Sequence, residues 1–211
     1  MIWLNSTDNY FPDYVHASEE GILAIGGDLS PERLLLAYSK GIFPWFNQED
    51  PILWWFPPER FVLFPANLKV SKTMRKVFRN QQFHFTENLA FEQVIRHCAE
   101  IPRKNQDGTW LTEEMIEAYV ELHRLGWAKS IEVWEEDTLV GGFYGIEVGR
   151  VFCGESMFSK VSNASKAGFI HFIATNFHEY DLIDCQVYTE HLESLGAEMI
   201  SAETFLQYIS K

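Results

Sequence analysis

Two short stretches of the sequence carry the side chains best suited to chemistry. Residues 151–158 place the carboxylate of Glu155 next to a hydroxyl, between apolar neighbours. Further along the chain, Asp184 and Gln186 lie two residues apart and therefore share one face of a strand. A carboxylate withdrawn from water has its pKa raised toward neutral pH, where it can act as a general base. We therefore take Glu155, Asp184 and Gln186 as the candidate catalytic residues.

Simpler explanations of these carboxylates stay open. Glu155 also fits a solvent-exposed position on a strand, and Asp184 fits the solvated end of one. Strict alternation along residues 151–158 predicts that Glu155 and Met157 share a face, while Gly154 indicates a bulge or a close backbone approach.

The elements between these stretches predict how they meet. A helix is expected at about 163–178, with Asn163 as its cap, followed by a strand at 182–187. A strand, a helix and a second strand joined by a right-handed crossover form a parallel pair. Glu155 and Asp184 would then face one cleft. Ser165, at the start of the helix, could contact phosphate or ribose.

The remaining elements predict an α/β (α+β) fold. Three strands at 130–134, 139–148 and 151–158 indicate an antiparallel meander ahead of the crossover helix. This order is that of the acetyltransferase-like (GNAT) fold, in which acyl transfer occurs where the sheet splays. We expect residues 63–211 to form this catalytic domain. Residues 1–62, with a proline-broken aromatic segment, are expected to form a small N-terminal domain that acts as an aromatic wall.

The charge distribution is uneven. The 211 residues carry a net charge of −13, yet no Asp or Glu occurs from Arg60 to Thr86. A helix over 72–80, capped by Ser71, would place four cations on one face, at i, i+3, i+4 and i+7. They are Lys72, Arg75, Lys76 and Arg79. A solvated helix face and a polyanion-binding face both fit this pattern.

Several classes of protein are disfavoured by composition. The sequence has no apolar run of membrane-spanning length and no secretory signal at its start. Its three cysteines suit neither a disulfide framework nor a zinc site, and no histidine pair has metal-ligand spacing. A cytoplasmic protein with reduced thiols and no metal is therefore expected. Residues 159–165 lack the glycines of a pyrophosphate-binding turn, so we expect no acetyl-CoA and no other cofactor.

Ten short segments of the sequence match a known family pattern: residues 26–30, 41–46, 53–55, 108–110, 130–134, 139–142, 152–159, 163–166, 183–186 and 194–197. On these segments, the sequence resembles the leucyl/phenylalanyl-tRNA–protein transferase family. The segments include Gly-Ile-Phe-Pro-Trp-Phe, Phe-Cys-Gly-Glu-Ser-Met-Phe-Ser and Ile-Asp-Cys-Gln, and they occur in family order over nearly the whole chain.

The resemblance implies a reaction. Leucine, phenylalanine or, less readily, methionine is moved from aminoacyl-tRNA to the N-terminal Lys or Arg of an acceptor protein. A peptide bond replaces the ester, and the new N-terminus is an N-end-rule signal for protein degradation. The implied enzyme is a cytoplasmic aminoacyltransferase that needs no cofactor, works as a monomer and has no membrane partner.

The resemblance also implies roles for residues. Asp184 with Gln186 would accept or relay the proton of the attacking amine, and Glu155 would hold the amino group of the donor. Trp45 and Trp110 would stack on the terminal adenosine of the tRNA. The cations of the helix over 72–80 would hold acceptor-stem phosphates. The donor side chain would enter an apolar pocket, assigned to Phe143, Phe152, Met157, Phe169, Phe172 and Ile183.

Two other functions remain open from the residues. A cofactor-using N-acyltransferase of the same fold would need the glycine turn that residues 159–165 lack. A non-catalytic RNA-binding module would not need paired acids beneath an apolar pocket. For Asp184, the roles of a general base and of a positioning group both fit the sequence.

Overall fold

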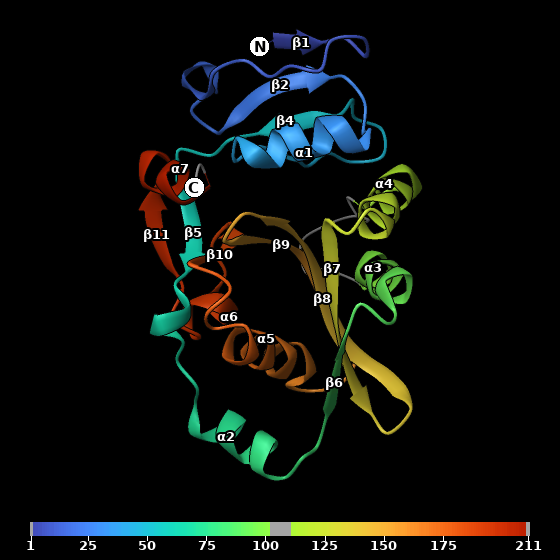
Figure 1. The fold of residues 1–211 in the computed structure, drawn as a ribbon, viewed down its shortest axis with the longest axis vertical. Coiled ribbons are helices and arrows are strands. Elements are labelled where there is room, and N and C mark those ends of the chain that lie inside the picture. The colour runs from blue at the N-terminus through green and yellow to red at the C-terminus, as the bar shows by residue number, and fades with distance from the viewer. Residues whose placement is uncertain (1, 102–110, 210–211) are drawn as a thin grey trace.

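The computed structural model describes residues 2–101 and 111–209 and contains two β-sheets (Figure 1). The smaller sheet has the strand order β1-β2-β4-β3. Its strands are β1 (Ile2–Leu4), β2 (Ile22–Gly26), β3 (Phe43–Pro44) and β4 (Leu53–Trp55). Helix α1 (Pro31–Ser39) lies beside it and begins at a proline, as the sequence predicts.

The aromatic segment of the N-terminal part forms β3, β4 and the core beneath them. Trp54 is fully buried, its ring meets Phe11 edge-on at 4.8 Å, and its indole Nε1 donates to the carbonyl of Gly26. Such edge-to-face packing stabilises a short, proline-broken segment that regular pairing alone would not hold. The two-residue length of β3 agrees with the expectation that this segment cannot form a long element.

The larger sheet has the strand order β11-β5-β10-β9-β8-β7-β6. Its strands are β5 (Glu59–Leu63), β6 (His84–Glu87), β7 (Ala128–Glu135), β8 (Thr138–Val148), β9 (Val151–Ser159), β10 (Leu182–Gln186) and β11 (Glu198–Ser201). Strands β7, β8 and β9 form the predicted antiparallel meander, and β10 pairs with β9 in parallel. The predicted α/β class and the acetyltransferase-like order of elements are therefore confirmed. The predicted domain boundary at residue 62 falls inside β5.

Helices cover both faces of this sheet (Figure 1). They are α2 (Lys72–Arg79), α3 (Phe91–Glu100), α4 (Glu113–Arg124), α5 (Ala164–Thr175), α6 (Glu190–Glu193) and α7 (Ala202–Ile209). Helix α5 covers one face, while α3 and α4 cover the other. Helix α5 lies so close to β7 that a Cβ on Gly168 would come within 2.6 Å of Val133. None of the helices in the described ranges is long and apolar enough to span a membrane.

The start of α5 differs from the prediction. Asn163 has a left-handed backbone with φ of +70° and makes no capping hydrogen bond through its side chain. Instead, the hydroxyl of Ser159 accepts from the backbone N–H of Ser165. Asn163 therefore occupies the predicted N-cap position, and its carbonyl accepts the first bond of the helix, but its side chain does not cap it. The final residue of β9 satisfies a free N–H group of the helix instead.

Strict alternation along β9 is also wrong. Ser156 pairs with Tyr144 and Gly154 pairs with Gly145, so Glu155 is the extra residue of a β-bulge. The extra residue shifts the side-chain alternation by one position. Met157 therefore packs with the cluster under α5, not on the same face as Glu155. The bulge that Gly154 suggested is present.

Candidate active site

A cavity of about 340 Å³ opens between strands β8, β9 and β10 and helices α5 and α6. It lies where β9 and β10 separate, since their last paired residues are Cys153 and Asp184. The residues that line it are Phe143, Tyr144, Gly154, Glu155, Ser156, Met157, Ser165, Phe169, Asp184, Cys185, Gln186, Val187, Thr189, His191 and Leu192. The three candidate catalytic residues are therefore brought together in one cavity.

The apolar part of the cavity contains half of the predicted pocket. Phe143, Met157 and Phe169 line it directly, and the rings of Phe143 and Phe169 meet edge-on at 5.6 Å. The other three predicted residues, Phe152, Phe172 and Ile183, are buried in the same cluster but do not line the cavity. They form the rigid layer behind it, which fixes the shape of the wall.

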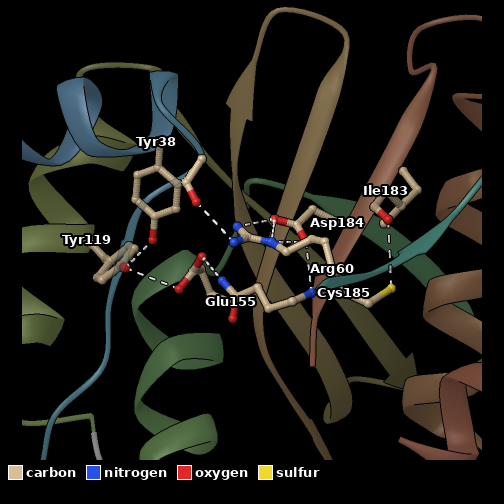
Figure 2. A network of polar contacts seen from close by, with 9 residues as sticks. Tyr38, Arg60, Tyr119, Glu155, Ile183, Asp184 and Cys185 are labelled. Carbon is tan, nitrogen blue, oxygen red and sulfur yellow. Dashed lines mark hydrogen bonds and ion pairs between the residues drawn. The ribbon is translucent and has the colours of Figure 1, made fainter. Parts of the chain in front are cut away.

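Glu155 bridges the gap between the separating strands. Its Oε1 accepts from Nε2 of Gln186 at 2.8 Å, and its Oε2 accepts from the hydroxyl of Tyr119 at 3.2 Å. The Tyr119 hydroxyl lies 2.5 Å from that of Tyr38, which comes from α1 (Figure 2). Burial raises the pKa of Glu155 to about 7. At neutral pH this carboxyl can therefore both accept and release a proton.

The hydroxyl of Tyr119 donates directly to this carboxylate, and the hydroxyl of Tyr38 is hydrogen-bonded to that of Tyr119. Burial, with the nearby charge of Glu155, raises the pKa of Tyr119 and of Tyr38 well above the usual tyrosine value. Both hydroxyls are therefore protonated at neutral pH.

Asp184 occupies a different environment from the one expected. It is fully buried, and Nε and Nη2 of Arg60 approach its carboxylate at 2.8–3.1 Å (Figure 2). Its Oδ1 also accepts from the backbone N–H of Gln186 at 2.8 Å. The alternative of a solvated strand end is therefore wrong, and the carboxylate is occupied by partners that hold it in place.

The hydrogen bond from its backbone N–H to Asp184 holds Gln186 in position. Its backbone is left-handed, with φ of +61°, and the pairing of β10 with β5 is irregular between Asp184 and Gln186. A non-glycine residue adopts this conformation at a cost of about 1–3 kcal/mol, so the surroundings must favour it. The Asp184 carboxylate supplies that support, and the side-chain amide of Gln186 then reaches Glu155.

The remaining predicted residues lie elsewhere, apart from Ser165, which lines the cavity. Trp45 follows β3, is 41% exposed and has its ring centroid 5.3 Å from that of Trp55. Trp110 lies outside the described residues. The four cations of α2 are exposed, and Ser71 caps the helix by accepting from the N–H of Met74. None of the salt bridges within residues 2–101 and 111–209 involves these cations.

Sequence reasoning missed three residues of this network: Arg60, Tyr38 and Tyr119. Arg60 sits in a short strand whose following residues are all apolar, and an arginine in such a strand must be paired. That signal was available, although it does not identify the partner. The tyrosines belong to amphipathic helices distant in sequence, where an aromatic residue is usually only a core residue.

No group of three or more metal-binding side chains occurs within the described residues. The expectation that the protein uses no metal stays a prediction.

Comparisons with known proteins agree with one another. The family model described as leucyl/phenylalanyl-tRNA protein transferase matches residues 62–210, and the model of its N-terminal domain matches residues 27–58. A leucyl/phenylalanyl-tRNA–protein transferase of Flavobacterium johnsoniae is 57% identical over 203 residues, which cover 96% of each chain. One of Christiangramia forsetii is 52% identical over 212 residues, covering 99% of this chain and 100% of the relative.

Solved structures resemble the chain more distantly. A conserved protein of unknown function from Bacteroides thetaiotaomicron is 13% identical with a TM-score of 0.47, covering 64% of this chain and 53% of its own. A GCN5-related N-acetyltransferase from Kribbella flavida is 10% identical with a TM-score of 0.41, covering 74% and 56%.

Proposed function

Because the chain belongs to the leucyl/phenylalanyl-tRNA–protein transferase family, we propose that it transfers an amino acid from aminoacyl-tRNA to a protein. The donor amino acid is Leu or Phe and, less readily, Met. The acceptor is the N-terminal Lys or Arg of a protein, whose new N-terminus then marks it for degradation. Family membership carries this proposal, and the cavity beside Glu155 and Gln186 supports it.

The apolar part of the cavity suits the donor side chain. A cavity of about 340 Å³, walled by Phe143, Met157 and Phe169, has room for a leucyl or phenylalanyl group. A methionine in the wall adapts to both shapes because its side chain is unbranched and flexible. With the side chain seated there, the ester carbonyl would lie toward the polar part of the cavity.

The polar part suits the two amino groups of the reaction. Peptide-bond formation joins the acceptor nitrogen to the ester carbonyl carbon and breaks the bond to the 3′-oxygen of the tRNA. Glu155 and Gln186 present a carboxylate and an amide to this region, and Asp184 positions Gln186 rather than taking up the proton. Ser165, also at the cavity, is a candidate contact for the donor.

The rest of the tRNA would meet the protein outside the cavity. The exposed cations of α2 are candidates for the acceptor-stem phosphates, and exposed Trp45 is a candidate for stacking on the terminal adenosine. The basic N-terminus of the acceptor is attracted by the net charge of −13. We also propose that the protein is a monomer and that it works in the cytoplasm, where aminoacyl-tRNA is made. Its proposed domains are residues 1–62 and 63–211.

Transfer of label from tRNA to peptide tests the function. Leucyl-tRNA carrying a labelled leucine is incubated with a peptide that begins with Arg, and with a control peptide that begins with Gly. We expect label in the Arg peptide only, and none after treatment with ribonuclease. Absence of label from the Arg peptide, with intact leucyl-tRNA still present, would contradict the proposal. Label that requires added acetyl-CoA would favour a cofactor-using acyltransferase.

A further inference from the structure

Three side chains that line the cavity could take up a proton: Asp184, His191 and Glu155. The first is already engaged, because Arg60 and the N–H of Gln186 occupy its oxygens. Burial, with the charge of Lys166, lowers the pKa of His191. A lowered pKa makes His191 a weaker base, which leaves Glu155 as the candidate to examine.

The hydrogen bonds of Glu155 suit a carboxylate that works as a base. Each of its oxygens accepts one bond, from Gln186 on β10 and from Tyr119 on α4. A carboxylate has about four lone-pair sites, so Glu155 keeps acceptor capacity for a substrate proton. Because the two donors hold the carboxylate from different elements, its orientation does not depend on the substrate.

The charged groups that face Glu155 leave its pKa at about 7. Asp184 raises the pKa of Glu155 and Arg60 lowers it, but these two groups pair with each other, so burial remains the main cause. Tyr38 and Tyr119 contribute neutral hydroxyls that favour the ionised form. Cys153, the other titratable group on the same strand, is buried, and burial raises the pKa of its thiol well above the usual value.

On the basis of the transferase function, we propose that Glu155 is the proton acceptor of the reaction. Its carboxylate removes one proton from the α-ammonium of the acceptor protein. The neutral amine attacks the ester carbonyl carbon, the carbon–nitrogen bond forms, and the bond to the 3′-oxygen breaks. The second amine proton ends on the 3′-hydroxyl of the tRNA, and Glu155 returns its proton to solvent. This role differs from holding the donor amino group, which the family resemblance suggested.

The test is the pH dependence of kcat/KM for an Arg-starting peptide at saturating leucyl-tRNA. The acceptor amine itself has a pKa of about 7.7–8.0, so it is already neutral near pH 9. We expect Glu155→Gln to lose about 100-fold or more near pH 6 and to regain most of that loss near pH 9, where no base is needed. Tyr119→Phe removes one hydrogen bond to the ionised carboxylate. It should therefore move the acid limb of the profile, which is the fall in kcat/KM at low pH, to higher pH.

Other outcomes would overturn the proposal. An equal loss in Glu155→Gln at every pH, with a raised KM for leucyl-tRNA, would assign Glu155 to donor binding. If kcat/KM of His191→Asn no longer falls at low pH, while that of Glu155→Gln still does, then His191 is the base. If the wild-type protein transfers no leucine at any pH, the proposed transferase function itself is contradicted. Failure of the proposed function is thereby distinguishable from failure of the proposed role of Glu155. Thermal unfolding of each variant checks that it is folded.

Discussion

Arg60 and Asp184 form an ion pair that is closed to solvent, with Nη2 of the arginine 2.8 Å from Oδ2 of the aspartate. The arginine is 2% exposed, and its guanidinium lies 4.7 Å from the ring centroid of Phe43 and 4.5 Å from that of Phe205. Its Nη1 also donates to the carbonyl of Gly41. The pair thereby joins the N-terminal sheet, the last helix and strand β10 at the point where the cavity begins.

Removing one partner of this pair is expected to be costly. Arg60→Met leaves the carboxylate of Asp184 buried without a counter-ion, and such changes cost about 3–5 kcal/mol in free energy of unfolding. Chemical denaturation of wild type and variant measures the difference. A loss below about 1 kcal/mol, which is typical of exposed pairs, would contradict a tightly coupled buried pair.

The double variant Arg60→Met/Asp184→Leu separates stability from positioning. Without either charge, most of the lost stability should return, because apolar residues often replace a buried pair at little cost. Transfer activity should not return, since the N–H of Gln186 has lost the Asp184 oxygen that holds it. Recovery of full activity in the double variant would show that Gln186 needs no such support.

The element order and the convergence of Glu155, Asp184 and Gln186 on one cavity were predictable from sequence, and the network of contacts within the candidate site was not. The meander, the crossover helix and the parallel strand follow from hydrophobic periodicity, which is a local property. The pairing of Arg60 with Asp184 joins residues 124 positions apart. Asp184 alone therefore looked like a possible base, and only the fold reveals its partner.

The bulge at Glu155 illustrates a second limit. Alternation on β9 fails by one residue, and that residue is the candidate catalytic residue Glu155. Gly154 indicated a bulge or a close backbone approach in β9. Which residue is the extra one depends on how β9 pairs with the neighbouring strand β8, and the sequence of β9 alone does not contain that information. β-bulges are over-represented next to active sites, so the alternation rule tends to fail where a site is built.

Helix α2 should contribute to tRNA affinity through charge. Arg75→Ala/Lys76→Ala removes two exposed cations that have no acidic partner within the described part of the chain. We expect weaker binding of leucyl-tRNA and a smaller salt dependence, by about 0.7–0.9 in the log–log slope for each phosphate that the variant no longer neutralises. Affinity measured over a series of salt concentrations provides the slope.

The matched control for α2 is Lys40→Ala/Arg124→Ala, which makes the same change in net charge on exposed positions away from the helix. If this control lowers the slope as much as the α2 variant, the effect is one of overall charge and the assignment to α2 fails.

Donor preference should depend on Met157. This side chain lines the cavity beside Phe143 and Phe169, so Met157→Ala enlarges the space available to the donor. We expect the ratio of phenylalanine to leucine transferred to rise several-fold, since a difference of about 1–3 kcal/mol is typical of such pockets. Competition between phenylalanyl- and leucyl-tRNA measures the ratio. Met199→Ala, at an exposed position on β11, is the control and should leave the ratio unchanged.

Glu155 should lower the stability of the folded protein at neutral pH. Its folded-state pKa is about 7, above the ordinary value of 4.5, so the folded state binds its proton more tightly than the unfolded state does. The stabilising contribution of this proton is complete below about pH 4.5 and is lost as the pH rises through about 7. Glu155→Gln, which cannot ionise, should therefore gain stability over wild type as the pH is raised from 5 to 8. Equal differences in unfolding free energy at both pH values would mean that Glu155 titrates normally, and would remove the energetic support for its role as a base.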